Sequence, residues 1–194
     1  MKTRMIIAAV IMATLTMSSM AQENNRRFGL EIRPGASLAT AKLGDAELKP
    51  GMGFEGTLQY NFFKGAALYA GWGWNKFASE ESFAGIDIDF EETGYVMGLR
   101  YTYRLPESPL GLFARAGAVY NHIEVEDGSD IITDSGHGWG WQAEAGVDIS
   151  FGKGWMLRPG LKYQSLNRDL TVGNTTRNVD LNYMSLGVGI SKFF

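Results

Sequence analysis

The chain ends on the stretch "DLNYMSLGVGISKFF", residues 180–194, and this stretch decides the fold. Apolar residues stand at Met184, Leu186, Val188 and Ile190, with serine or glycine between them. A period of two is typical of a β-strand with one apolar face. Free chain ends are usually solvated, so a terminus of two phenylalanines needs an apolar environment for its rings. We expect that environment to be a lipid bilayer.

The first 21 residues have the layout of a secretory signal peptide. Lys2 and Arg4 precede a short apolar segment, and Ser19 and Ala21 supply small residues before a cleavage site. The apolar segment is too short for a membrane-spanning helix, which needs about 20 apolar residues. We predict that residues 1–21 are cleaved and that residues 22–194 form one exported domain.

The composition restricts the classes of function. The chain has a formal net charge of −3 and loses two further basic residues with the signal peptide, which argues against nucleic-acid binding. It has no cysteine, so disulfides and thiolate chemistry are excluded. Its 25 glycines, together with Asn and Asp, cluster between apolar runs, as is typical of many strands joined by turns.

The alternation of the last strand recurs along the chain. Eight alternating segments are interpreted as strands: Phe28–Ala39, Gly51–Phe62, Ala66–Phe77, Glu92–Arg104, Leu110–Ile123, Gly138–Phe151, Trp155–Ser165 and Val179–Phe194. Their connections alternate between short turns such as "LPESP" and long polar stretches, which is typical of outer-membrane barrels. The sequence predicts an all-β fold, an eight-stranded antiparallel up-and-down transmembrane β-barrel with short periplasmic turns and four long extracellular loops.

Two observations indicate that the apolar face of the strands points to lipid. In residues 138–151, tryptophans alternate with glycines and charged side chains, a mixture that suits a narrow interior better than a solvent face. Aromatic residues also fall near both ends of the strands, as expected at two membrane–water interfaces. The predicted membrane-interface aromatics are Trp72, Trp74, Tyr101, Tyr103, Tyr120, Trp139, Trp141, Phe151, Trp155 and Tyr163. A soluble exported barrel or sandwich is the alternative, and it would reverse the two faces.

The inward positions predict a filled lumen, because eight strands enclose a space just wide enough for side chains. The predicted ionic network is Glu31, Arg33, Glu55, Arg100, Arg104, Arg115, Glu144, Asp148, Arg158 and Lys162, with Gln59, Gln142 and Gln164 beside it. A turn centred on Lys153 places Asp148 opposite Arg158 and Glu144 opposite Lys162. Such a network plugs the barrel. A small porin-like channel along the charges is the alternative, whereas a hydrophobic conduit is disfavoured because the lumen face is polar.

The signal peptide, the eight segments, the aromatic belts and the terminal phenylalanine together resemble the small outer-membrane barrels of the OmpA and OmpX type. The resemblance covers the mature chain and implies a monomer in the cell outer membrane, in contact with lipid and lipopolysaccharide. It also implies that the barrel-assembly machinery reads the last strand, with Leu186, Val188, Ile190 and Phe194 as the assembly signal. Lys192 departs from the family pattern, because that position of the alternation is usually apolar.

The remaining polar residues give weaker indications. Eleven acidic residues lie in the second and third long connections: Glu80, Glu81, Asp87, Asp89, Glu91, Glu92, Glu124, Glu126, Asp127, Asp130 and Asp134. They offer a surface for a partner or for divalent cations bridging to lipopolysaccharide, but they lack the spacing of a calcium motif, and we expect no metal and no cofactor. The stretch "IDIDF" also alternates, so the second connection is expected to extend as a hairpin.

An enzyme that modifies lipid A is the competing class of function. It would use His122, with Glu124 two residues on, at the outer face. No serine follows at the spacing that such a site suggests. The sequence therefore predicts a non-enzymatic barrel with a structural or surface-interaction role.

Overall fold

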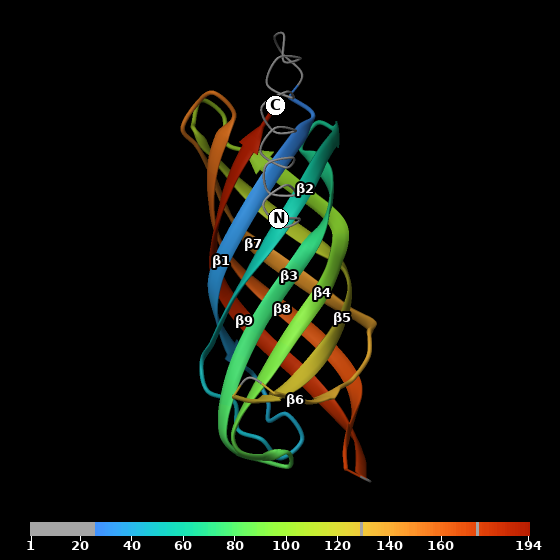
Figure 1. The fold of residues 1–194 in the computed structure, drawn as a ribbon. Coiled ribbons are helices and arrows are strands. Elements are labelled where there is room, and N and C mark those ends of the chain that lie inside the picture. Colours follow the sequence, from blue (N-terminus) through green and yellow to red (C-terminus); the bar gives the residue numbers. More distant parts are fainter. Residues whose placement is uncertain (1–25, 129, 174) are drawn as a thin grey trace, which may run out of the picture.

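The computed structural model describes residues 26–128, 130–173 and 175–194, which form a closed β-barrel (Figure 1). The predicted signal peptide lies outside these residues. In the described part of the chain, no helix is long and apolar enough to cross a membrane. The strands are β1 Phe28–Ala39, β2 Gly51–Phe63, β3 Ala66–Ser82, β4 Gly85–Arg104, β5 Leu110–Asp127, β6 Asp130–Asp134, β7 Gly138–Ser150, β8 Trp155–Val172 and β9 Thr175–Phe193.

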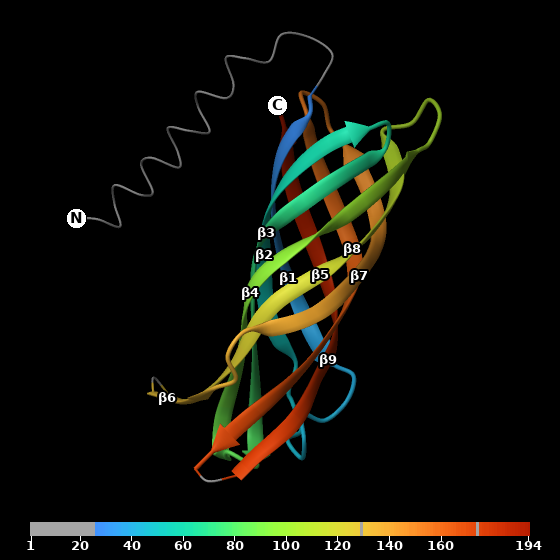
Figure 2. The ribbon, with the colours of Figure 1, turned by 90° about the vertical axis from the view of Figure 1, so that its right-hand side faces the viewer.

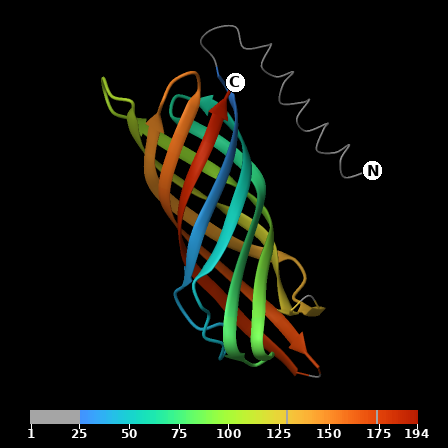
Figure 3. The same ribbon diagram turned by 60° about the vertical axis from the view of Figure 1, so that its left-hand side comes forward.

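Eight of these strands form a ring of antiparallel pairs. The order around the ring is β1, β2, β3, β4, β5, β7, β8, β9, and β9 pairs back with β1. β6 lies outside the ring and pairs with the last residues of β5. Figures 2 and 3 show the strands inclined to the long axis of the barrel, as closure of a sheet requires. The fold class predicted from the sequence is confirmed.

The two ends of the barrel differ in their connections. The start of β1, the end of β9 and the short connections 64–65, 105–109 and 151–154 lie together at the upper end in Figure 1, which we call the turn end. The opposite end, the loop end, carries the connection 40–50, β6, and the tips of the β3–β4 and β8–β9 hairpins.

Strand structure continues through two of the predicted loops. β3 and β4 remain paired up to Ser82 and Gly85, and β8 and β9 remain paired up to Val172 and Thr175. The expected hairpin around "IDIDF" is therefore present. These extensions are ordered because alternate side chains on them point inward and pack together, as described next.

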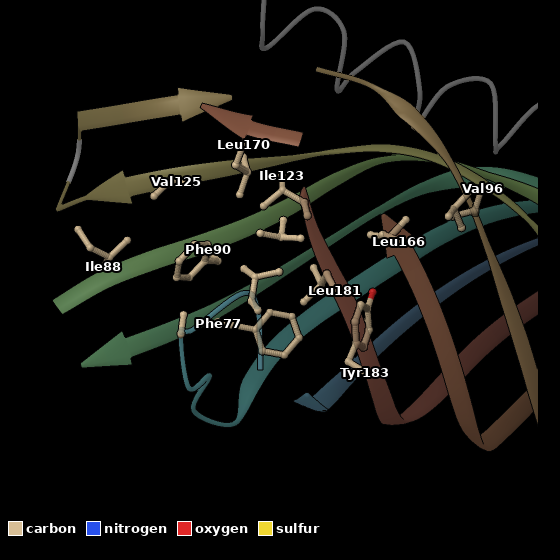
Figure 4. Close-up of a cluster of buried hydrophobic side chains, with 14 of the residues drawn as sticks. Phe77, Ile88, Phe90, Val96, Ile123, Val125, Leu166, Leu170, Leu181 and Tyr183 are labelled. Carbon is tan, nitrogen blue, oxygen red and sulfur yellow. The ribbon is translucent and has the colours of Figure 1, made fainter. Parts of the chain in front are cut away.

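The lumen has two chemically different halves. At the loop end the inward side chains form an apolar cluster, shown in Figure 4. It consists of Leu43, Ala46, Tyr69, Phe77, Ile88, Phe90, Val96, Val119, Ile123, Val125, Leu166, Leu170, Val179, Leu181 and Tyr183. Leu43 and Ala46 belong to the connection 40–50 and pack against the inward side chains of the strands. The expectation of a polar lumen thus holds only for the turn-end half; about half of the apolar inward positions lie in predicted strands and the others in segments interpreted as loops.

Candidate functional site in the lumen and at the loop end

The turn-end half of the lumen holds a connected series of buried ion pairs. Arg158 of β8 is 1% exposed, and its Nε lies 2.7 Å from Asp148 Oδ1. Its Nη1 lies 2.5 Å from Glu31 Oε2, while Glu31 Oε1 lies 2.9 Å from Arg33 Nη2. These four side chains come from β1, β7 and β8, so the series ties separate strands together across the lumen.

The series continues through Glu144 and Arg115. Arg33 Nη1 lies 2.5 Å from Glu144 Oε1, and Arg115 Nη2 lies 2.5 Å from Glu144 Oε2. Arg115 Nη1 then lies 2.7 Å from Glu55 Oε1, and Lys162 Nζ ends the series 3.5 Å from Glu55 Oε2. Four carboxylates therefore meet four cations, as buried charges require.

The sheet register agrees with the pairing expected from the turn at Lys153. Glu144 stands opposite Lys162, and Gln142 stands opposite Gln164. The expected pair of Asp148 with Arg158 forms, whereas Lys162 does not pair with Glu144, because its ammonium lies near Glu55 on the far side of the lumen. The register determines that Lys162 stands opposite Glu144, but the length of the lysine side chain lets its ammonium reach Glu55.

Arg100 and Arg104 lie at the edge of the network. Arg100 is buried, donates to Gln59 and lies over the ring of Phe193, with 5.6 Å from its Cζ to the ring centroid. Arg104 is exposed at the turn-end mouth and forms no ion pair with a described residue. Its inclusion in the ionic network is corrected here, because β4 ends at this residue and its side chain reaches water.

Glycines make room for the network. A Cβ built on Gly160 would lie 2.4 Å from Glu144 Oε1, and one on Gly189 would lie 2.9 Å from Arg33 Nη2. Between Arg33, Glu55 and other inward side chains lies a cavity of about 20 Å³, and a wider open space at the turn-end mouth reaches Arg100 and Asp148. The cavity holds about one water molecule.

A polar layer around Glu92 separates the ionic network from the apolar cluster. The Tyr183 hydroxyl donates to Glu92 Oε2 at 2.8 Å, and Gln164 Nε2 donates to Oε1 at 2.8 Å. Asn121 Nδ2 also donates to Oε1. The carboxylate is 2% exposed and is held by neutral donors in place of a cation.

The predicted lipid-facing residues all lie on the outer face. The ten predicted interface aromatics are exposed or half-buried there, and several pack in pairs, as Tyr120 does with Trp139 at 5.0 Å between ring centroids. On β9, Leu186, Val188 and Ile190 are exposed, and Phe194, the residue after β9, is half-buried.

A second polar group lies on the outer face just beyond the loop-end aromatics. His122 Nδ1 lies 2.9 Å from Asp134 Oδ1 and 3.7 Å from Glu124 Oε1. The ring of His137 stacks on that of His122, with 4.3 Å between centroids and 17° between planes. The nearby Ser135 hydroxyl is engaged by the backbone, accepting from Ile123 N and donating to Gly136 O.

The surroundings change the acidity of both carboxyl groups in this group. Burial raises the pKa of Glu124, and the nearby Asp134, Glu91 and Glu126 carboxylates act in the same direction, against an opposing contribution from His122. Burial also acts to raise the pKa of Asp134, but hydrogen bonds from His122 and from the Gly136 N–H outweigh it, so the pKa is lowered.

Comparison with known proteins identifies the family. The family described as "outer membrane protein beta-barrel domain" matches residues 7–191. The chain belongs to this family. No curated protein matches the chain in sequence. Membership places this barrel in the outer membrane, and the resemblance expected from the sequence is confirmed.

Solved structures of outer membrane barrels share the fold. Neisserial surface protein A is 15% identical, with a TM-score of 0.62 over 89% of this chain and 100% of that one. AlkL, determined in lipid bilayers, is 18% identical, with a TM-score of 0.57 over 90% and 93% of the two chains. The Escherichia coli outer membrane protein W is 13% identical, with a TM-score of 0.54 over 87% and 97%. At these identities the likeness concerns the fold alone.

Sequence reasoning missed two lumen residues of this outer membrane barrel and the partner of a third residue, Asp134. Phe193 lies in the lumen over Arg158, with 5.3 Å from the Arg158 Cζ to the ring centroid, and its inward phase was readable from the alternation of β9. Tyr183 was readable in the same way. Asp134 carried no such signal, since its contact with His122 depends on the unpredicted strand β6.

Proposed function

We propose that this outer membrane barrel is a non-enzymatic protein with a closed lumen that acts at the cell surface through its loop end. The observation that carries the proposal is the filling of the lumen. The ionic network occupies the turn-end half, and the apolar cluster occupies the loop-end half. We therefore expect the described residues to leave water and ions no continuous path past both, and the packing of Leu43 and Ala46 from the connection 40–50 into the apolar cluster supports this.

Conductance in planar bilayers tests the closed lumen. We expect the purified mature chain to show no stable open level at neutral pH. The positive control opens both halves: it combines Arg115→Ala/Glu144→Ala, which shortens two side chains that meet in the middle of the network, with Leu43→Ala in the apolar cluster. A stable open level in the unmodified protein, carried by its own lumen, would replace this proposal with the small-channel alternative.

Export and assembly belong to the same proposal. Residues 1–21 act as the signal peptide, and the barrel-assembly machinery reads Leu186, Val188, Ile190 and Phe194 on β9. The outward placement of these side chains supports this reading, as does the position of β9 between β8 and β1. The mature protein is a monomer whose aromatic belts meet lipid and lipopolysaccharide, with the turn end in the periplasm.

The loop end is the surface that we assign to partners. It carries many exposed or half-buried carboxylates on β3, β4, β5 and β6, against few cations such as Lys49 and Lys76. A partner with a basic surface is the chemistry that such an end attracts. We expect binding of a polycationic probe, polylysine, to weaken as salt rises from low to physiological concentration. Binding that is unaffected by salt would contradict this assignment.

The enzyme alternative rests on His122 alone. Its Nδ1 pairs with Asp134, and the hydroxyl of Ser135, the residue after Asp134, is engaged by the backbone. We expect identical lipid A mass spectra from cells with and without the protein. A mass change that disappears in His122→Ala would overturn the non-enzymatic proposal.

A further inference from the structure

Both histidines of the chain meet on the outer face, although fourteen residues separate them. His122 lies on β5, and His137 lies in the segment that returns from β6 to β7. Two carboxylates join them, because Glu124 stands directly opposite Asp134 in the β5–β6 pair. One ligand atom each from His122, Glu124 and Asp134 lies within 4.8 Å of the others.

We propose that His122, Glu124 and Asp134 form a binding site for a first-row transition-metal dication, with Zn²⁺ as the physiological candidate. Zinc takes imidazole nitrogen and carboxylate oxygen at about 2.0–2.2 Å, so two of its ligands stand at most about 4.4 Å apart. The His122 Nδ1 to Asp134 Oδ1 distance of 2.9 Å and the His122 Nδ1 to Glu124 Oε1 distance of 3.7 Å meet that limit.

The donor set favours a transition metal over calcium or magnesium. The two hard cations take oxygen ligands, whereas imidazole suits zinc, copper and nickel. The two carboxylates balance the charge of a dication. The site is also held in position. Asp134 Oδ1 accepts the Gly136 N–H at 2.8 Å, and β6 pairs with β5 from Asp130 opposite Asp127 to Asp134 opposite Glu124.

The arrangement leaves the ion accessible from one side. The side chains of His122 and Glu124 are 11% and 19% exposed, whereas that of Asp134 is 45% exposed. Three protein ligands leave at least one position of a tetrahedral ion for water or for an outside group. The site lies next to Tyr120 and Trp139 of the loop-end belt, since both His137 and Trp139 pack on Tyr120.

Glu124 distinguishes a metal site from a simple hydrogen-bonded pair of His122 and Asp134. Without a metal, His122 and Asp134 form a hydrogen-bonded pair that needs no third group. Glu124 accepts no hydrogen bond from any described residue; its ion-pair partner is His122 at 3.7 Å, and its carboxylate also lies within 4.8 Å of those of Glu91 and Glu126. In the metal site this carboxylate is a ligand of the ion. Zinc affinity must therefore depend on Glu124, whereas the hydrogen bond between His122 and Asp134 does not need it.

The test is a metal titration of the mature chain folded in detergent and freed of metal with a chelator. Zn²⁺ binding is measured by calorimetry, and Co²⁺ binding by its visible absorption and its displacement by Zn²⁺. The variants are His122→Gln, Glu124→Gln and Asp134→Asn. Glu81→Gln is the matched control, since Glu81 is an exposed acidic residue of the same end and lies outside the cluster. Cold and boiled electrophoresis verifies that every variant is folded.

We expect one Zn²⁺ per chain in the unmodified protein and in Glu81→Gln, and affinity at least about tenfold weaker in each of the three cluster variants. Two results would overturn the site. One is Glu124→Gln binding Zn²⁺ as the unmodified protein does, which leaves only the hydrogen-bonded pair. The other is Ca²⁺ displacing Co²⁺ as effectively as Zn²⁺ does, which indicates a non-selective acidic surface. The inference stands apart from the closed lumen, since neither result depends on conductance.

Discussion

Arg158 shows what a single charge does inside this lumen. Its guanidinium is shared between Asp148 and Glu31, and it also lies over the ring of Phe193. With almost no water beside it, the loss of this one cation would leave two carboxylates without their closest partner. Breaking a buried pair in this way costs about 3–5 kcal/mol, whereas an exposed pair contributes about 0–1 kcal/mol.

We therefore predict that Arg158→Met lowers the free energy of unfolding by about 3–5 kcal/mol, measured by denaturant titration of tryptophan fluorescence in micelles. Arg177→Gln is the control, since Arg177 pairs with Asp45 at 2.9 Å on an exposed surface. It is expected to cost less than about 1 kcal/mol. Equal effects of the two variants would contradict the assigned role of the network.

Sequence reasoning reached the inward phase of these residues and the pair of Asp148 with Arg158, but not the partners of the other charges. The period of two fixes which side chains share a face, because a shift of one residue turns every side chain over. It does not fix which cation meets which carboxylate, because a narrow lumen lets Lys162 of β8 reach Glu55 of β2. The pairing of His122 with Asp134 was equally out of reach, since it depends on a five-residue strand without alternation.

Among the elements, the connection 40–50 behaves as a lid built into the loop end. Leu43 and Ala46 are fully buried, and their backbones exchange hydrogen bonds of 3.0 Å in both directions. Two contacts outside the cluster fasten the same connection: Lys49 N donates to Ala78 O at 2.8 Å, and Lys49 Nζ lies 2.7 Å from Glu80 Oε1.

We predict that Leu43→Ala undocks this connection without unfolding the barrel. Truncation of a buried leucine costs about 2–5 kcal/mol. We expect this loss to exceed the stabilisation that the other contacts of the connection 40–50 provide. Amide hydrogen exchange at Leu43 and Ala46 should speed up by at least about tenfold, while the amides of β8 and β9 keep their protection. Leu186→Ala is the control, because Leu186 is 67% exposed on the outer face. Unchanged exchange at Ala46 would show that the connection is held by other contacts.

The Lys49–Glu80 contact gives the connection a dependence on pH. The hydrogen bond and the charge of Lys49 lower the pKa of Glu80 below its ordinary value of 4.5. The contact therefore adds stability above that ordinary value and loses it as pH falls through the lowered value. Protection of the Lys49 amide should decline over that acidic range. Glu80→Gln should abolish the decline, and a decline that survives in this variant would assign it to another group.

For the molecule as a whole, the apolar outer face and the two aromatic belts were enough to predict a closed membrane barrel. Eight apolar-faced segments with an even count can satisfy every backbone group in lipid only by closing into a ring. The apolar half of the lumen could be predicted only in part. The inward phase of Val179 and Leu181 was readable from the last predicted strand, whereas Leu166 and Leu170 lie in a stretch interpreted as a loop, and only the continued pairing of β8 with β9 turns them inward.

The charge distribution and the positions of the chain ends lead to a prediction of orientation. Exposed basic residues such as Arg26, Lys64 and Lys153 gather at the turn end, and exposed acidic residues gather at the loop end. The chain has no cysteine, so a single introduced thiol reports one site. We predict that Asp130→Cys reacts with a large polyethylene-glycol maleimide on intact Gram-negative cells. Lys64→Cys should react only after the outer membrane is permeabilised. The unmodified protein should not react before or after permeabilisation, because it has no cysteine. The opposite order of labelling would place the turn end outside and would remove the acidic end from the cell surface.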